Sequence, residues 1–215
     1  MFLEELAREI EGEVRAPAEG PLRRIGVALD GDAEVVGWAR AEGLDAVVLH
    51  RARELDQAPE GVGVVGCHDW LDAHIPAWLA EDAGLRSPAP LLDHEDVLVG
   101  TAPEDLRERV RELLGGEEAF HPGEDEPVSV AVVAGAMTES LVRAAAEEGA
   151  SLYVTGQWRA PAANAVAETG IAVQVCGHRR LERWALGALA DLLEERHEDL
   201  DVLVAPEEDA PGATG

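Results

Sequence analysis

The chain has 215 residues, and 47% of them are hydrophobic, which is enough apolar material for one sizeable domain or two small lobes. Acidic residues outnumber basic ones by 44 to 17, the formal net charge is −27, and every basic residue is an arginine. This charge disfavours nucleic acid and anionic membranes as partners and favours divalent cations. With no basic leader and no apolar run of about 18 residues, we expect a cytoplasmic protein.

The first predicted elements alternate between strand and helix. A strand over 24–30 meets a turn and is followed by a helix over 33–42, and the next strand, 46–49, ends at His50. A third strand, 61–67, runs into a helix that begins with His68 and carries Asp72 four residues later. The pattern predicts parallel strands that are covered by helices.

The same order returns about a hundred residues later. A strand over 128–134 precedes a helix over 137–148 and a strand over 151–154. The third strand, 170–176, again leads to a histidine and a carboxylate four residues apart, His178 and Glu182. The sequence therefore predicts an α/β fold with two similar lobes, each built on a mixed, largely parallel sheet covered by helices.

The segment between the two halves is rich in turn formers. Residues 91–102 are predicted to be extended, and a helix runs from 103 to 114. Glycine, proline and acidic residues then dominate 115–127. We predict a first lobe over 1–114, a linker over 115–127, a second lobe over 128–205 and a disordered tail over 206–215.

Metal-competent side chains gather where the predicted strands end. Ligands in such folds bind beyond the carboxyl ends of parallel strands. Five residues with suitable donor atoms lie there: His50, His68, Asp72, His178 and Glu182. A single pair at i and i+4 is ordinary helix-surface electrostatics, but the repetition of the pair at strand ends favours a metal site.

Other chemistries have less support. Cys67 and Cys176 each end a predicted strand, and we interpret them as small core residues, with a ligand or redox role as the alternative. The glycines fit neither a phosphate-binding loop nor a dinucleotide fingerprint, and no Ser/His/Asp or Cys/His set is recognisable. Among the tryptophans, Trp158 follows a strand end and is the candidate for lining a substrate site.

Several motifs in order resemble one known family. They are Gly26-Val-Ala-Leu-Asp30, Cys67-His68-x3-Asp72, Val99-Gly100, Tyr153-Val-Thr-Gly156 and Gly177-His178-x3-Glu182. Together they span about residues 3–204 and resemble the NIF-three-like family, also called dinuclear metal centre proteins or GTP cyclohydrolase I type 2. The resemblance implies two α/β lobes, a metal cleft between them and a homo-oligomer, commonly a ring-shaped hexamer.

The resemblance also implies a ligand set. The matching metal-ligand positions are His50, Asp72, His178 and Glu182, with His68 near the site, and the cofactors would be one or two divalent ions such as Zn, Mn or Fe. The chain departs from the family pattern at Arg51, which stands where a second consecutive histidine is usual. A guanidinium there could replace a metal as the compensating cation or bind an anionic substrate.

We therefore expect a metal-dependent, hydrolase-like activity on a small-molecule substrate of unknown identity, with nucleotides and other phosphate compounds as candidates. Arg51 and His68 are the candidate catalytic residues, and Arg179 and Trp158 are the candidate substrate-binding residues. Two alternatives stay open. One is a non-catalytic, oligomeric metal-binding or interaction scaffold, and the other is a metal-free protein in which Arg51 pairs with Asp72 or Glu182.

Overall fold

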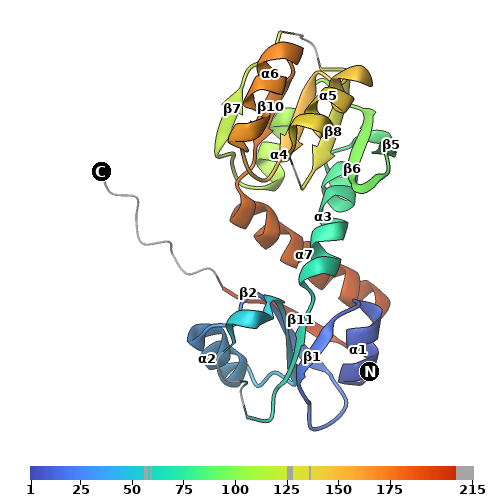
Figure 1. Cartoon of the computed structure of the whole chain (residues 1–215). Coiled ribbons are helices and arrows are strands. Elements are labelled where there is room, and N and C mark those ends of the chain that lie inside the picture. Colours follow the sequence, from blue (N-terminus) through green and yellow to red (C-terminus); the bar gives the residue numbers. More distant parts are fainter. Residues whose placement is uncertain (56–57, 59, 125–127, 136, 207–215) are drawn as a thin grey trace. The chain divides into compact units, whose positions relative to one another are not determined.

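The structure is a computed structural model that describes residues 1–55, 58, 60–124, 128–135 and 137–206. The chain forms two compact units, one comprising Met1–Leu71 together with the chain from Leu186 onward, and the other comprising Asp72–Ala185. The chain passes from the first unit to the second inside helix α3 (His68–Asp82), and it returns to the first unit inside helix α7 (His178–Arg196) (Figure 1). The units therefore do not follow the predicted boundary at 115–127.

Unit 1 is built on a five-stranded sheet with the order β1-β4-β3-β2-β11. The strands are β1 (Glu13–Ala16), β2 (Arg24–Asp30), β3 (Ala46–Arg51), β4 (Gly63–Gly66) and β11 (Asp201–Val204). All neighbours are parallel except β1, which runs antiparallel to β4. The parallel strands β2, β3 and β4 confirm the alternation seen in the sequence, whereas β11 joins this sheet from the far end of the chain.

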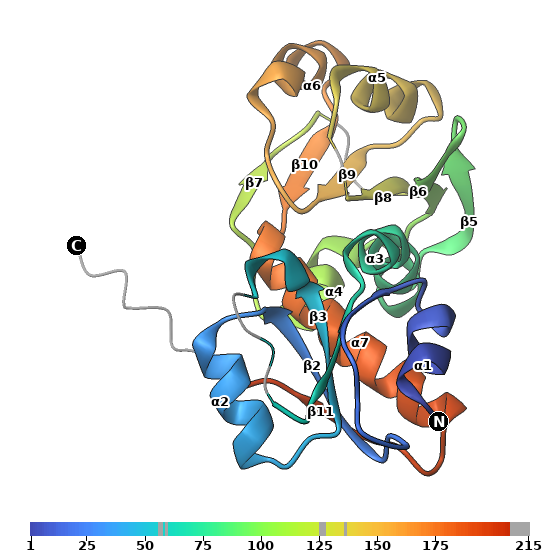
Figure 2. The ribbon, with the colours of Figure 1, turned by 60° about the horizontal axis from the view of Figure 1, so that its bottom comes forward.

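Helices α1 (Leu3–Glu9) and α2 (Ala33–Ala41) cover opposite faces of this sheet (Figures 1 and 2). On one face, Trp38 and Ala39 of α2 pack in a core cluster with Val47 and Val64. On the other, Leu3 of α1 lies against Gly63. Successive side chains of each buried strand point to opposite faces of the sheet, and both faces are covered by a helix. The strands are therefore apolar throughout.

Unit 2 contains a six-stranded sheet with the order β5-β6-β8-β9-β10-β7. The strands are β5 (Arg86–Leu91), β6 (His94–Thr101), β7 (Ala119–His121), β8 (Val130–Ala134), β9 (Leu152–Thr155) and β10 (Ala172–Val175). The three central strands β8, β9 and β10 are parallel, and the strands that flank them, β6 and β7, are antiparallel to them. The fold is therefore mixed α/β with two sheets, as predicted.

The helices of unit 2 cover both faces of its sheet. The first face carries α5 (Glu139–Glu147) and α6 (Ala163–Thr169), which share a core cluster with Tyr153 and Val173. The other face carries α4 (Leu106–Leu113), because Gln174 on that face donates from Nε2 to the Arg107 carbonyl at 3.0 Å. Among the described helices, none is long and apolar enough to cross a membrane.

The segment predicted as a linker contributes structure of its own. Within it, β7 pairs with β10, and Glu117 joins two other elements. Its carboxylate accepts hydrogen bonds from Arg107 on α4 and, at 3.1 Å, from Gln174 on β10. Turn-forming and charged residues predicted a linker here, and the structure shows that polar contacts with buried Gln174 hold this segment against the sheet. Residues 125–127 and the predicted tail from 207 lie outside the described residues.

This contact gives a prediction for folding stability. The hydrogen bond from Arg107 keeps the pKa of Glu117 below its ordinary value, with burial opposing that shift. A carboxyl with a lowered pKa stabilises the fold above its unfolded-state pKa, and that stability is lost as the pH falls through the folded-state pKa. Glu117→Gln should therefore lower the unfolding free energy by about 1–2 kcal/mol at pH 7.

Denaturant unfolding of wild type and Glu117→Gln at a series of pH values measures this effect. The difference should shrink in acid below the ordinary glutamate range. Glu147→Gln, a change at an exposed position of α5, should have little effect and serves as the control. A difference between wild type and Glu117→Gln that persists undiminished in acid would contradict the ion-pair explanation.

Candidate metal centre

Two neighbouring parallel strands deliver the histidines of the candidate site. Strand β3 carries His50 near its end, where the side chain is buried. Strand β4 is in register with β3, pairing Gly66 with Leu49, and the Cys67 N–H donates to the Leu49 carbonyl at 3.0 Å. Helix α3 then begins at His68, so the two imidazoles leave adjacent strand ends.

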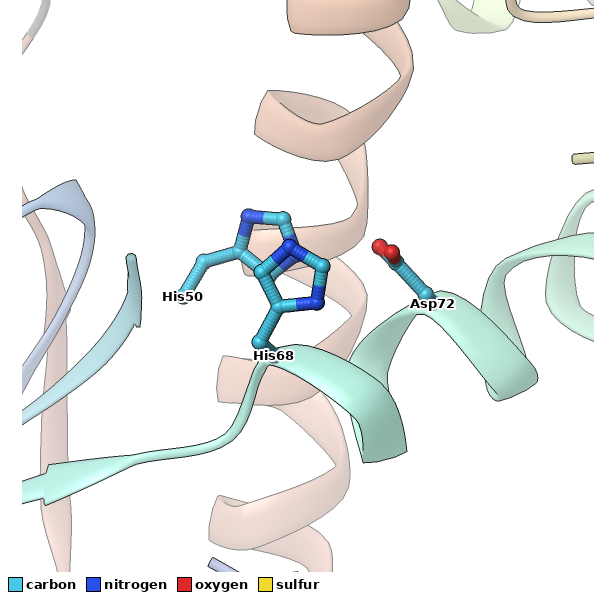
Figure 3. Close-up of side chains that lie close together, drawn as sticks. All are labelled: His50, His68 and Asp72. Atoms are coloured by element: carbon cyan, nitrogen blue, oxygen red, sulfur yellow. The ribbon is translucent and has the colours of Figure 1, made fainter. Parts of the chain in front are cut away.

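The third member of the group comes from the next turn of α3. Asp72 lies four residues after His68 on the same helix, which places the two side chains on one helical face. One donor atom from each of His50, His68 and Asp72 lies within 4.8 Å of the donor atoms of the other two. Figure 3 shows the Asp72 carboxylate directed toward the two imidazoles.

The donor set suits a divalent transition metal. Two imidazoles and one carboxylate are a common protein ligand set for zinc and related ions, and they leave a coordination position open. The rings of His50 and His68 are stacked, with centroids 4.4 Å apart and planes at 15°. His50 is buried, whereas His68 is exposed and Asp72 half-buried, so the last two side chains have room to close on an ion.

Pro76 affects the backbone at this site. It lies inside α3 and has no amide hydrogen, so the carbonyl of Asp72 cannot accept the usual helical bond from the residue four places on. The division between the two units falls directly before Asp72, between Leu71 and Asp72. The helix is therefore weakest in hydrogen bonding at the residue that supplies the carboxylate of the group.

Arg51 follows His50 directly and is held on its own sheet. Its Nη1 donates to Oδ1 of Asp30 at 2.9 Å, and both side chains are largely buried. The two residues are also register partners at the ends of β3 and β2. A partly buried ion pair of this kind orients the guanidinium, which presents its remaining donors in a fixed plane.

The second copy of the motif forms a close pair in unit 2. Nε2 of His178 lies 3.1 Å from Oε1 of Glu182, one turn further along α7. Glu182 is buried and His178 is exposed. The backbone repeats the first copy, because the Cys176 N–H donates to the Thr155 carbonyl at 2.8 Å, as that of Cys67 does to Leu49.

Aligning the two copies by this hydrogen bond shows where they differ. Since Thr155 corresponds to Leu49, the position that corresponds to His50 is Gly156. The second copy therefore has a histidine and a glutamate but lacks the strand-end histidine. A Cβ on Gly156 would lie 3.3 Å from Cδ2 of Leu181 and 3.7 Å from Cα of His178, so a side chain at this position would be crowded.

The two predicted substrate-binding residues lie in unit 2. Trp158 is half-buried, and its ring stacks on His121 of β7 with centroids 4.0 Å apart. Arg179 is exposed in the first turn of α7. Their roles stay predictions.

A pocket in unit 1 adjoins the histidines. It has a volume of about 340 Å³ and is lined by residues from three segments of the chain, 11–15, 50–53 and 66–69. His50, Arg51 and His68 line it, as expected of strand-end residues. Sequence analysis missed Arg15 and Arg53, because no motif marks them and β1 was not predicted.

Comparisons with known proteins agree with the sequence motifs. A sequence model of the family described as Duf34/NIF3 (NGG1p interacting factor 3) matches residues 55–211, which is more than half of the chain. No curated protein matches the sequence. The family match confirms the resemblance on which the ligand predictions were based.

Solved structures share the fold. Protein ybgI, of unknown function, has a TM-score of 0.78 at 19% identity over 96% of both chains. TTHA1606 from Thermus thermophilus has a TM-score of 0.74 at 21% identity, covering 98% of this chain and 100% of its own. Reduced HcgD from Methanocaldococcus jannaschii has a TM-score of 0.71 at 19% identity, covering 95% and 97%. At these identities the similarity shows the fold.

Cys176 should be chemically inert in the folded protein. It is buried, and burial, together with the charge of Glu117, raises the pKa of its thiol to about 12. Since the thiolate is the reactive form, iodoacetamide at neutral pH should modify Cys176 only after unfolding. Peptide mass spectrometry with and without denaturant measures this, and rapid labelling of the native protein would contradict the buried, neutral thiol.

Proposed function

This chain belongs to the Duf34/NIF3 family, and we propose that it binds a divalent metal ion through His50, His68 and Asp72 and hydrolyses a small phosphate-containing molecule. The observation that carries the proposal is the convergence of three donor atoms within 4.8 Å of one another at the ends of two parallel strands. Zn, Mn and Fe are the ions whose preferences for nitrogen and oxygen donors fit this set.

The residues around the donors have separable tasks in this proposal. An ion held by these residues would supply Lewis acidity. Asp69, whose Oδ1 lies 3.3 Å from Nδ1 of His68, would hold that ring with Nε2 free to act as the ligand. Arg51, oriented by Asp30, would bind an anionic group of the substrate from the pocket wall.

The pair His178 and Glu182 is proposed as the ligand pair for a further ion, which would give one or two ions per chain. The buried carboxylate of Glu182 beside an imidazole at 3.1 Å supports this role, because a cation compensates a buried negative charge. Arg179 and Trp158 are proposed to contact the substrate. Assembly into a homo-oligomer is also a proposal, carried by family membership.

A second candidate function is a non-catalytic metal-binding or scaffold protein. The ion pair between Arg51 and Asp30 favours it, since a guanidinium fixed beside His50 places a permanent positive charge where a further cation would be repelled. Hydrolysis of phosphoesters that a chelator abolishes would support the enzyme. Tight metal binding without turnover of any phosphoester or nucleotide would support the scaffold.

Metal content tests the site directly. Protein purified without chelator or affinity metal should contain at least one equivalent of a transition metal by elemental mass spectrometry. Both His50→Ala and Asp72→Ala should lose most of it, since a site with three protein ligands loses most of its affinity when one is removed. Circular dichroism would confirm that each variant is folded.

His94→Ala is the matched control, because it removes an exposed imidazole of β6 outside the group. It should retain the metal content of wild type. The variant His178→Ala reports the second pair separately, so loss of part of the metal there would indicate a further ion. Folded wild type without metal, even after incubation with Zn²⁺ or Mn²⁺, would disprove the proposed site.

A further inference from the structure

The pocket of unit 1 has a lining that is unusual for this chain. Arginines make up 17 of the 215 residues, but they supply three of the eleven residues that line the pocket, Arg15, Arg51 and Arg53. They come from separate segments, β1, the end of β3 and the short 3-10 helix after it. In a protein of net charge −27, such a concentration of guanidinium groups requires an explanation.

The three arginines differ in their ion-pair partners. Arg51 is bound by Asp30 at 2.9 Å, and Arg15 lies 2.7 Å from Glu13. Arg53 is exposed, and no hydrogen bond or ion pair joins it to another residue in the part of the chain that the structure describes. With respect to the described residues, the Arg53 guanidinium therefore keeps its donors for a ligand.

Acidic residues also line the pocket, and they limit what can enter. Glu11, Glu13 and Asp69 balance the three arginines in formal charge. A divalent ion on His50, His68 and Asp72 would leave one net positive charge on the metal site, because only the aspartate is anionic. With that ion bound, an anion between the metal ligands and the arginines is favoured.

The volume limits the size of this anion. A pocket of about 340 Å³ lies at the lower end of the range for small-molecule sites. The net charge of −27 opposes a polyanion such as nucleic acid. Guanidinium forks and divalent ions are both preferred partners of phosphate oxygens.

From these observations we infer that the pocket of unit 1 binds a small phosphate monoester, with Arg53 donating to the phosphate. The inference rests on the proposed metal site and names its substrate class. It assigns Arg53 a substrate-binding role that neither the sequence motifs nor the family match suggested.

Binding of inorganic phosphate to the Mn²⁺-loaded protein tests the inference. Isothermal titration calorimetry gives the affinity, and broadening of the ³¹P resonance by bound Mn²⁺ reports whether the phosphate lies beside the metal. Arg53→Gln should raise the Kd for phosphate by about tenfold, through loss of charge-assisted hydrogen bonds, without changing Mn²⁺ uptake. Because Arg53 is exposed, the variant should fold normally.

Arg40→Gln is the matched control. It removes the same charge from an exposed position of α2 in the same unit but outside the pocket, and it should bind phosphate as wild type does. Equal weakening in both variants would overturn the inference, because net charge alone would then explain the binding. Normal Mn²⁺ uptake without phosphate binding would overturn it too and leave the metal site standing.

Failure of the metal site itself is distinguishable from these outcomes. If wild type takes up no Mn²⁺, the proposed function fails. The phosphate titration of the metal-free protein then tests separately whether the pocket binds phosphate. Phosphate binding that Arg53→Gln weakens and Arg40→Gln does not would support the pocket. Absence of phosphate binding would overturn it.

Discussion

The hydrogen bond from the Cys67 amide to the Leu49 carbonyl holds the ends of two parallel strands level, and the candidate site depends on it. Because the strands end side by side, His50 and His68 emerge next to each other, although 18 positions separate them in the sequence. Asp72 lies four residues after His68 on the same helix, so helix geometry alone places its side chain on the same face. One sheet edge and one helical turn are therefore sufficient to bring the three donor atoms together.

The same backbone arrangement occurs in both sheets but leads to different chemistry. Cys176 donates to Thr155 as Cys67 donates to Leu49, and a helix with a histidine and a carboxylate four residues apart follows in each case. Only the first copy has a histidine at the end of the middle strand. A single position, His50 against Gly156, thus determines whether three donors converge or two. The repeated motif determines the backbone arrangement, and the residue at the strand end determines how many donor atoms are available to a metal ion.

Sequence periodicity was sufficient to predict the central parallel strands, their helices and the spacing of His68 and Asp72, because these features depend on local patterns. It could not predict β7 or β11, since a three-residue strand and a strand that joins the sheet from the far end of the chain have no local signature. The division of the chain inside α3 and α7 was missed for a related reason. Continuous helices show no break in composition where the chain passes from one unit to the other.

The arginines illustrate what sequence analysis could not resolve at the site. From the sequence alone, Arg51 had two possible partners, a metal-site carboxylate or an anionic substrate. The register between β2 and β3 places Asp30 opposite it, so an ion pair within the sheet satisfies part of its donor capacity. This pair orients the guanidinium that follows His50, and the donor atoms of His50, His68 and Asp72 lie grouped at the same strand end. A fixed cation and a cluster of metal ligands can therefore coexist at one strand end, and this combination favours a ligand that carries negative charge.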